Sequence, residues 1–264
     1  MSSDQAVVLD VAGTMLRMYR VANDLLRGRL LTQIVTADLI MEKSGRALVV
    51  PQMDPAEIMA RPPDLPLSSL LAGHEDGIEI SCFSTEVSRE EAISIIMRSR
   101  ARIADIQKTH RAVKSRCPET YQTTGMIVDV DARDIPYIVS TGGEPFPGLS
   151  AVIRRLQMSG VEVHVASGDS MRSLVHLVEY GIHLDRINAV ASPRRKQEVV
   201  LRLKKDHRRV VMVGDGLNDL YALQAADLGV LTVQQQTSPP QRLVEAADVV
   251  IEDIRDLPGL LTEQ

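Results

Sequence analysis

The sequence predicts an α/β protein in which a parallel-sheet core is interrupted by an inserted α+β region. Two observations predict the core: short apolar runs alternate with helix-period segments at both ends of the chain, and small polar or acidic residues follow several of these runs. A third predicts the insert, because residues 21–140 show turn signals, clustered prolines and hairpin patterns. We expect a core of residues 1–20 and 141–264 and an inserted domain of residues 21–140, hinged near Arg20 and the paired glycines 142 and 143.

Composition limits the class of protein and its partners. The 264 residues suit one large or two modest domains, and the core must be aliphatic because 44% of residues are hydrophobic but only 3% aromatic. The net charge of −5 disfavours nucleic acid or an anionic membrane as a partner. Cys82 and Cys117 lack CxxC spacing, which favours a reducing, cytoplasmic location. We find neither an apolar run near the roughly 18 residues of a membrane span nor a signal-peptide pattern.

The first predicted strand, residues 6–9, ends just before Asp10. The sequence DVAGT occupies residues 10–14, and we expect a helix from Met15 onward. Asp10 therefore follows a buried strand directly, which is where ligands bind in open α/β sheets. A turn that caps a helix is the alternative interpretation of this short pattern.

The insert is expected to hold a small core of its own. Ser88 and Glu91 match a capping box, which predicts a helix over residues 88–116. Asp129, Asp131 and Asp134 surround a hairpin turn; they lack the Gly and the distal Glu of a calcium loop, so we expect a solvated turn. The other expected elements are a helix at 55–60 and strands at 31–40, 47–50, 78–87, 126–130 and 135–139.

Regular alternation returns after residue 141 and predicts βαβ units. Strands are expected at 161–166, 187–191, 210–213, 228–233 and 249–251, with helices at 147–158, 170–180, 193–205, 219–226 and 240–246. The strands are rich in Val, Ile and Leu, as are parallel strands buried on both faces. The basic run at 194–196 is interpreted as a solvated helix face rather than a nucleic-acid patch, in keeping with the acidic net charge.

Residues 210–219, VVMVGDGLND, carry the densest polar pattern. The four apolar residues predict a buried strand, and Asp215, Asn218 and Asp219 follow it. Gly214 and Gly216 permit a tight turn and a close approach of another group. Two carboxylates crowded at a strand end repel each other unless a cation compensates, and Mg²⁺ suits an all-oxygen site. We therefore predict a Mg²⁺ site here; the alternative is a strand-to-helix turn with an acidic cap.

Groups that suit phosphoryl transfer follow four of the predicted strands. They are a carboxylate, a hydroxyl, an ammonium and an acid pair: Asp10, Ser167, Lys196, and Asp215 with Asp219. A carboxylate can attack phosphorus, a metal and a lysine neutralise the spreading charge, and a hydroxyl with backbone N–H groups holds the oxygens. Taken alone, Ser167 suits a helix N-cap and Lys196 a surface position. Taken together, the four groups predict one site at the carboxyl edge of the sheet.

In this order the motifs resemble those of the haloacid dehalogenase superfamily of aspartyl phosphotransferases. DVAGT at 10–14 resembles its first motif, Ser167 stands where its second ends a strand, SPRRK at 192–196 resembles the third, and GDGLND at 214–219 closely matches the fourth. With SGD at 167–169, the core is most similar to the phosphorylation domain of P-type ATPases. The resemblance covers the two flanks and implies a doubly wound, Rossmann-like core with an inserted cap.

The resemblance also implies a role for each matching residue. Asp10 would be the nucleophile that becomes an aspartyl phosphate. The residues that would bind the phosphoryl group are Ser167, Gly168, Lys196 and Asn218. The Mg²⁺ ligands would be Asp10, the Ala12 backbone carbonyl, Asp215 and Asp219. We therefore expect a Mg²⁺-dependent phosphohydrolase or phosphotransferase that acts on a small phosphorylated metabolite.

Ala12 departs from the family's usual pattern. Phosphatases of the family usually have a second Asp there as general acid and base, and P-type ATPases have Thr. Phosphonoacetaldehyde hydrolases have Ala together with a cap lysine that forms a Schiff base, so C–P cleavage is an alternative that would need Lys43, Lys108 or Lys114. A regulatory or scaffold protein with weak catalysis is the third alternative. The helix expected at 88–116 also offers a surface for a homodimer.

Overall fold

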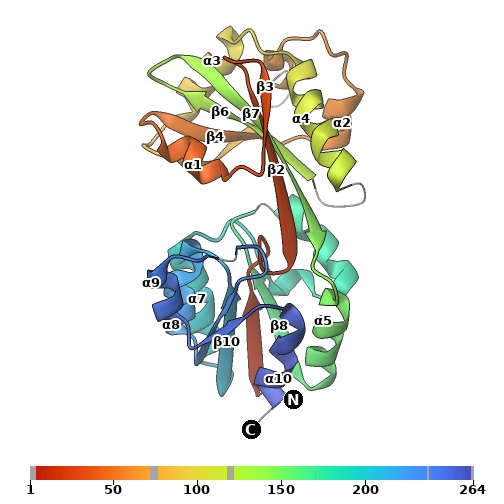
Figure 1. Ribbon diagram of the computed structural model, residues 1–264, viewed down its shortest axis with the longest axis vertical. Helices are drawn as coiled ribbons and strands as arrows, with labels where there is room; N and C mark the ends of the chain where they lie inside the picture. The colour runs from red at the N-terminus through yellow and green to blue at the C-terminus, as the bar shows by residue number, and fades with distance from the viewer. Residues whose placement is uncertain (1–3, 72–76, 118–121, 170, 237, 263–264) are drawn as a thin grey trace. The chain divides into compact units, whose positions relative to one another are not determined.

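The computed structural model describes residues 4–71, 77–117, 122–169, 171–236 and 238–262 (Figure 1). The chain divides into two compact units: a core unit of Met1–Met18 with Glu144–Gln264, and an inserted unit of Tyr19–Gly143. Strand β2 (Leu16–Asp24) carries the chain out of the core unit, and strand β7 (Asp134–Pro145) carries it back. None of the helices within the described ranges combines the length and apolar character that a bilayer crossing requires.

The core unit is built on a 6-stranded parallel sheet in the order β12-β11-β10-β1-β8-β9. Its strands are β1 (Gln5–Leu9), β8 (Val161–Ala166), β9 (Ile187–Asn188), β10 (Arg209–Gly214), β11 (Leu228–Thr232) and β12 (Val249–Ile251). Strand β1 lies between β10 and β8 and pairs with both. Nearly all side chains of β1 and β10 are buried, as a sheet covered on both faces requires.

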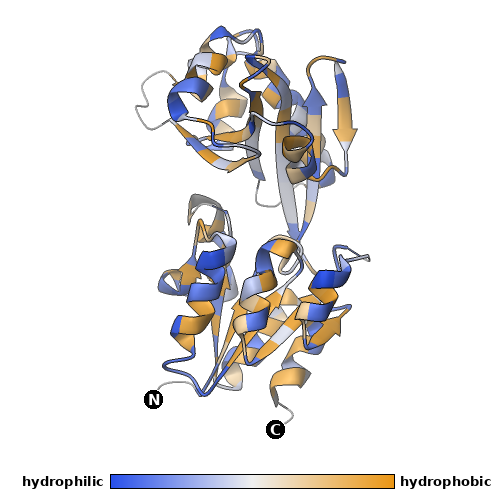
Figure 2. Ribbon diagram, turned by 90° about the vertical axis from the view of Figure 1, so that its left-hand side faces the viewer, coloured by the Kyte–Doolittle hydropathy of each residue, from blue (hydrophilic) through white to orange (hydrophobic). Residues whose placement is uncertain are grey.

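Helices cover both faces of this sheet (Figure 1). On one face lie α7 (Pro193–Leu203), α8 (Leu220–Ala225) and α9 (Gln241–Ala246), whose apolar side chains share a core with alternate residues of β1 and β10. On the other face lie α5 (Leu149–Met158) and α10 (Leu257–Thr262), which contact each other. Figure 2 shows the strands largely in the hydrophobic colour and the helices in both colours. The predicted doubly wound parallel sheet is therefore confirmed.

Three predicted elements of the core unit differ from the structure. The segment after Gly13 is not a helix but a tight turn that leads into β2. The strand expected at 187–191 ends at Asn188, because Val190 adopts a left-handed conformation with φ 50° and turns the chain away. The helix expected at 170–180 is divided into α6 (Met171–Leu174) and a 3-10 helix, η2 (Val175–Tyr180); residue 170 lies outside the described residues.

The inserted unit has its own 6-stranded sheet in the order β3-β2-β7-β6-β4-β5. Its remaining strands are β3 (Arg29–Thr32), β4 (Arg46–Pro51), β5 (Ile78–Phe83) and β6 (Gln122–Asp129). Met126 and Val128 of β6 pack with residues of α2 (Pro55–Ala60), α3 (Arg89–Arg98) and α4 (Ile103–Arg116). Ile127, on the opposite face, packs with Ile40 of α1 (Thr36–Met41). Side chains that alternate between two covered faces explain why both sides of this sheet are apolar.

The helix expected at 88–116 is two helices rather than one. Ser88 caps α3 as predicted: its hydroxyl accepts the Glu91 N–H at 3.2 Å, and the Glu91 carboxylate accepts the Ser88 N–H at 2.9 Å. The chain then leaves the helix at Ser99 and starts α4 at Ile103. Two backbone hydrogen bonds hold this break: the Leu67 N–H donates to the Ala101 carbonyl, and the Ile103 N–H donates to the Leu65 carbonyl. A tertiary contact therefore overrides a locally continuous helical pattern.

Other predictions for the inserted unit are also wrong in part. The strand expected at 31–40 is β3 followed by α1, because Gln33, with φ 55°, ends the strand. The strand expected at 78–87 ends at Phe83. The expected hinge positions are strand residues, since Arg20 lies in β2 and Gly142 and Gly143 lie in β7. The boundaries between the two units fall within two residues of them, and the hinge itself stays a prediction.

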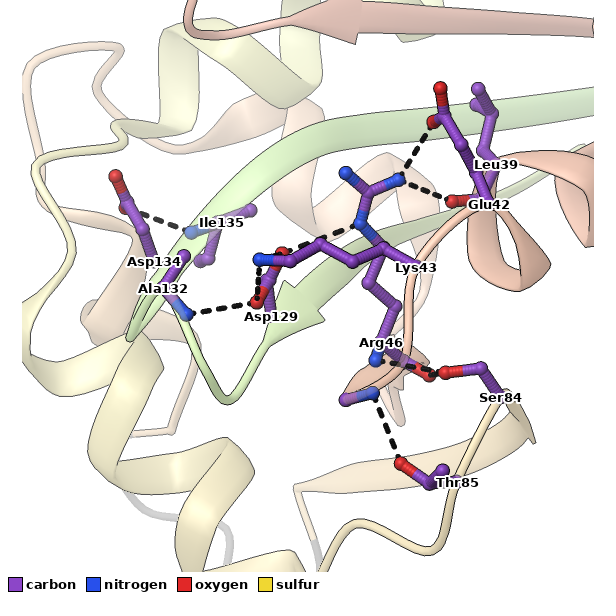
Figure 3. A network of polar contacts seen from close by, with 11 residues as sticks. Leu39, Glu42, Lys43, Arg46, Ser84, Thr85, Asp129, Ala132, Asp134 and Ile135 are labelled. Carbon is purple, nitrogen blue, oxygen red and sulfur yellow. Dashed lines mark hydrogen bonds and ion pairs between the residues drawn. The ribbon is translucent and has the colours of Figure 1, made fainter.

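The acidic turn of the inserted unit is only half solvated. Asp131 and Asp134 are exposed, as predicted, but Asp129 is only 2% exposed. Its carboxylate forms ion pairs with Lys43 at 2.9 Å and Arg46 at 3.4 Å, as Figure 3 shows. Asp129 is therefore a buried structural anion of the inserted unit rather than part of a solvated turn.

Candidate active site

Parallel pairing places polar residues at one edge of the core sheet. Asp10 follows β1, Ser167 follows β8 and Asp215 follows β10. Because β1 pairs with both neighbours, the three strands end side by side at the carboxyl edge. The Asp10 N–H donates to the Val213 carbonyl at 2.9 Å, which extends the β1–β10 ladder by one residue. Asp10 therefore lies between the ends of the two strands that carry the other polar groups.

A tight turn follows Asp10 and fixes the backbone around it. The Leu16 N–H donates to the Val11 carbonyl at 2.9 Å, and the Gly13 N–H donates to the Leu16 carbonyl at 2.8 Å. Gly13 has φ +87°, and a Cβ atom at this position would lie 1.8 Å from Asp215 Oδ2. Glycine is therefore required twice, for its left-handed backbone and for the close approach of the Asp215 carboxylate.

Lys196 connects two carboxylates from different loops. Its Nζ donates to Asp10 Oδ1 at 2.5 Å and to Asp219 Oδ1 at 2.6 Å. The lysine side chain is 1% exposed, whereas the two arginines before it on α7 are exposed. The basic run at 194–196 is therefore a solvated face only at its first two residues. The third points inward and supplies the cation of the cluster.

Asp219 holds the loop of the fourth motif together. The residue is fully buried, and its Oδ2 accepts the N–H groups of Asp215 and Gly216, each at 3.2 Å, while its Oδ1 accepts the lysine bond. A Cβ atom on Gly214 would lie 2.5 Å from the Asp219 carboxyl carbon, so only glycine lets this carboxylate fold back over the loop. Asn218 is exposed, with its Oδ1 over the Gly216 backbone.

Ser167 begins the loop after β8 and is bonded to the loop after β9. Its N–H donates to the Asn188 carbonyl at 3.0 Å, and its carbonyl accepts the Ala191 N–H at 2.8 Å. Its buried hydroxyl donates to Asp169 Oδ2 at 2.9 Å and accepts the Asp169 N–H at 3.2 Å. Gly168, between them, is exposed. The loop is thus held by its own hydrogen bonds, with one residue presented to solvent.

The acid cluster fits a hard divalent cation. Asp10, Asp215 and Asp219 each offer a carboxylate oxygen within 4.8 Å of the others, which no other group of His, Cys, Asp or Glu does within the described ranges. The Lys196 ammonium binds two of these carboxylates, Asp10 and Asp219, and the third, Asp215, lies close to both. All-oxygen donors at this spacing suit Mg²⁺. Ala12, whose carbonyl was predicted as a further ligand, lies half-buried two residues after Asp10.

Electrostatics of the cluster follow from its burial. Burial raises the pKa of the Asp10 carboxyl well above its ordinary value; the Lys196 ammonium opposes this shift, and the Asp219 and Asp215 carboxylates add to it. Burial disfavours the charged form of Lys196, but the Asp10 and Asp219 carboxylates outweigh this effect and hold the pKa of the ammonium above its ordinary value. Lys196 is therefore charged, and the group whose ionised form is disfavoured is the Asp10 carboxyl rather than the lysine.

The structure groups the predicted site residues unevenly. Asp10, Lys196, Asp215 and Asp219 converge in one cluster. Ser167 stands at the adjacent strand end, and the exposed Gly168 and Asn218 lie on the flanking loops of this edge. The metal and phosphate roles assigned to these residues stay predictions.

Sequence reasoning missed two residues that contact the first motif or the strand that follows it. Gln234 Nε2 donates to the Thr14 carbonyl at 3.5 Å, and the side-chain amide of Gln235 binds both backbone groups of Met18. The only signal in the sequence is a run of glutamines after a strand that ends at the same edge. Glutamine has no fixed association with such turns, so its pattern gave no reason to look there.

Known proteins resemble this chain in sequence and in structure. A soluble P-type ATPase-like phosphatase of Methanocaldococcus jannaschii is 32% identical over 254 residues, which cover 96% of this chain and 91% of that protein. A probable copper-importing P-type ATPase of Enterococcus hirae is 37% identical over 100 residues, 38% of this chain and 13% of the ATPase, so the match spans a small part of the transporter. A solved phosphoserine phosphatase, as a phospho-aspartyl intermediate analogue, is 16% identical with a TM-score of 0.47, covering 98% of this chain and 99% of that one.

The family assignment rests on a match to most of the chain. A model of the family described as haloacid dehalogenase-like hydrolase matches residues 5–227, which include the first motif, the whole insert and the fourth motif. The relative from Methanocaldococcus jannaschii matches the insert as well as the flanks, since it covers nearly the whole chain. The protein is therefore a hydrolase, and it belongs to the haloacid dehalogenase-like hydrolase family.

Proposed function

We propose that the protein is a Mg²⁺-dependent phosphohydrolase that acts through an aspartyl phosphate on Asp10. The observation that carries this proposal is the buried contact between Asp10 and Lys196 beside two further carboxylates. A carboxylate nucleophile needs a neighbouring cation to neutralise the charge of the phosphoryl group it attacks. The relative described as a soluble P-type ATPase-like phosphatase supports the same reaction class.

Each residue of the site has a defined task in this mechanism. A carboxylate oxygen of Asp10 attacks phosphorus, and the bond to the leaving group breaks as that group takes the electron pair. Lys196 neutralises charge on the phosphoryl oxygens, while Ser167, Gly168 and Asn218 donate hydrogen bonds to them. Water then hydrolyses the aspartyl phosphate and frees Asp10.

The cation that completes the site would be held by Asp10, Asp215, Asp219 and the Ala12 carbonyl. When bound, Mg²⁺ supplies charge neutralisation to the transferring group. We expect Asp215→Asn to weaken Mg²⁺ binding strongly, because it removes a negative ligand from the cluster. Isothermal titration of wild type and variant with Mg²⁺ measures this directly. An unchanged Mg²⁺ affinity would contradict the assignment of Asp215.

Ala12 points to the class of substrate. A methyl group can neither protonate a leaving group nor activate water, and general acid–base catalysis contributes about 10²–10⁴-fold. Substrates whose leaving group needs no proton, such as acyl phosphates or a nucleotide's terminal phosphate, would therefore react well. Sugar-alcohol phosphates would react slowly, and the aspartyl phosphate would accumulate because its hydrolysis also lacks a base.

The substitution Ala12→Asp tests this reasoning. We expect it to raise turnover of unactivated phosphomonoesters by up to about 10²-fold and to change turnover of acetyl phosphate much less. Steady-state rates with Mg²⁺ over a metabolite panel provide the measurement, and Asp10→Asn serves as the inactive control. Ordinary rates on sugar phosphates, unchanged by Ala12→Asp, would mean that the catalytic proton comes from another residue.

The alternative of C–P bond cleavage has less support. Lys43 donates to Asp129 and Lys108 donates to Asn23 at 3.0 Å, so two of the three candidate lysines are bound by partners within the inserted unit. Lys114 is exposed on α4. Trapping of a lysine by borohydride with a carbonyl substrate would overturn our preference. A cytoplasmic location stays a prediction from the spacing of Cys82 and Cys117. A homodimer also stays a prediction, although two helices, α3 and α4, stand in place of the single long helix on which it was based.

A further inference from the structure

We infer that Gln235 is a positioning residue for the nucleophile: its side-chain amide holds the first residues of β2, and through them the turn that carries Asp10. This inference rests on the proposed function for its kinetic consequence but not for its geometry. The contact joins residues 217 positions apart in the sequence, both within the core unit.

Gln235 binds Met18 as a neighbouring strand would. Its Oε1 accepts the Met18 N–H at 2.8 Å, and its Nε2 donates to the Met18 carbonyl at 3.3 Å. The N–H and C=O of one residue in an extended strand point the same way, so a single amide can satisfy both. Strand β3 pairs with β2 only from Val21 to Asp24. Next to Met18, the Gln235 side chain therefore makes the two hydrogen bonds that a paired strand would make.

Gln234 anchors the same loop to the core and to the motif turn. Its Oε1 accepts the Ile254 N–H at 2.9 Å, and its Nε2 donates to the Thr232 hydroxyl at 3.0 Å. The same Nε2 also lies 3.5 Å from the Thr14 carbonyl. The glutamine pair thus joins the end of β11 to two points on the segment that follows Asp10.

The hydrogen-bonded turn connects the Met18 contact to Asp10, the proposed nucleophile. Met18 is two residues beyond Leu16, whose N–H and carbonyl both close the turn by bonding Val11 and Gly13. Phe146 adds a further bond from its N–H to the Met15 carbonyl at 3.0 Å. A nucleophile must be held within about 0.5 Å of its productive geometry, so a loosened Met18 would lower kcat more than substrate binding.

The substitution Gln235→Glu gives a test with its own pH signature. A protonated glutamic acid keeps one donor and one acceptor, like the amide, whereas the ionised form keeps only acceptors and places a negative charge against the Met18 carbonyl. Gln235 is exposed, so an ionised carboxylate there has water and need not unfold the chain. We expect kcat to fall about five- to tenfold as the pH rises above the carboxyl pKa, ordinarily about 4.3, with KM little changed.

The neighbouring Gln236 offers a matched control. It is exposed, and its Nε2 donates to the Ser238 carbonyl at 3.2 Å within its own loop. Gln236→Glu adds the same charge one residue away without removing a bond to Met18. The measurement is the ratio of kcat for Gln235→Glu to kcat for Gln236→Glu across pH, with p-nitrophenyl phosphate and Mg²⁺. Gln235→Ala, which loses both bonds at every pH, should show a low kcat ratio with no pH dependence.

Hydrogen exchange of the Met18 amide provides a readout that needs no activity. We expect faster exchange in Gln235→Ala, and in Gln235→Glu at neutral pH, than in wild type or Gln236→Glu. A kcat ratio that is constant with pH would overturn the positioning role, and faster exchange with unchanged kcat would reduce Gln235 to a structural contact. Failure of the proposed function is distinguishable, because wild type would then hydrolyse no phosphate ester while Met18 exchange still reported the contact.

Discussion

Asp10 in the core unit and Asp129 in the inserted unit are both buried carboxylates bound by a lysine. Their other charged neighbours differ. Asp10 shares Lys196 with Asp219 and lies beside Asp215, so two further acids are close to it. Asp129 binds two cations, Lys43 and Arg46, and the second of these also pairs with Glu42 at 2.9 Å (Figure 3). The close grouping of three acids is thus what distinguishes the candidate site from a structural ion pair.

The pKa values of the two carboxyl groups shift in opposite directions. Burial raises the pKa of Asp10 and its lysine does not reverse the shift. Burial opposes ionisation of Asp129 as well, but the Ala132 N–H, Lys43 and Arg46 outweigh it and lower the pKa of that carboxyl. Arg46 is itself held by the Leu39 carbonyl at 2.7 Å. The Asp129 network is built from ion pairs and hydrogen bonds of the inserted unit, whereas the spacing of the Asp10 cluster suits a divalent cation.

The largest expected effect separates the two carboxylates by activity. Asp10→Asn should lower phosphatase kcat by at least about 10³-fold, because an amide cannot attack phosphorus. Asp129→Asn should leave kcat within about twofold, because no predicted catalytic group touches Asp129. Steady-state kinetics with an activated phosphate ester test both variants. Equal losses from the two substitutions would erase the functional distinction between the two sites.

The next effect concerns the two lysines and the stability of the fold. In the absence of divalent cations, Lys196→Met should lower the free energy of unfolding by about 3–5 kcal/mol, since it leaves buried carboxylates without their cation. Lys43→Met is the matched control: Lys43 is 42% exposed and Arg46 remains, so the loss should be under about 1 kcal/mol. Urea denaturation of both variants supplies the comparison. A larger loss of unfolding free energy for Lys43→Met than for Lys196→Met would contradict this expectation.

The smallest expected effect concerns Asp129 and pH. Asp129→Asn should cost about 1–3 kcal/mol of unfolding free energy at pH 7. The pKa of Asp129 is lowered in the folded state, so its contribution is complete above the ordinary carboxyl pKa near 3.9 and is lost as the pH falls through the lower folded value. The difference between wild type and variant should therefore shrink below about pH 4. Urea denaturation at neutral and acidic pH measures it, and a constant difference would show that the ionised form carries no stability.

Much of the core unit could be predicted because a parallel sheet ties sequence pattern to position. Valine-rich runs marked the strands, and residues after those runs must reach one edge, so Asp10 and Asp215 had to meet. Their spacing to Lys196 could not be predicted, because the inward turn of one residue in a basic helix depends on the rotation of α7. The basic run at 194–196 predicted three solvated cations, whereas only the first two are exposed.

The inserted unit was harder to predict because its boundaries are set by distant contacts. The break between α3 and α4 has no Pro or Gly and is held by backbone bonds to residues 65 and 67. Asp129 sits in a sequence of turn-forming acids, and only the fold shows that Lys43 and Arg46 reach it. In a parallel sheet, the register largely fixes which side chains meet. In antiparallel and mixed regions, the local sequence pattern does not determine the partners of a side chain.

The hydrogen bond from the Phe146 N–H to the Met15 carbonyl, 3.0 Å long, has an evolutionary consequence. Met15 and Phe146 lie within three residues of the points where the inserted unit leaves and rejoins the core unit, so the two ends of the core chain are tied together there. Exchange of the inserted unit, Tyr19–Gly143, for another segment would keep this tie and the strand order of the core sheet. The turn after Asp10 and the acid cluster therefore depend on residues of the core unit and not on the identity of the insert.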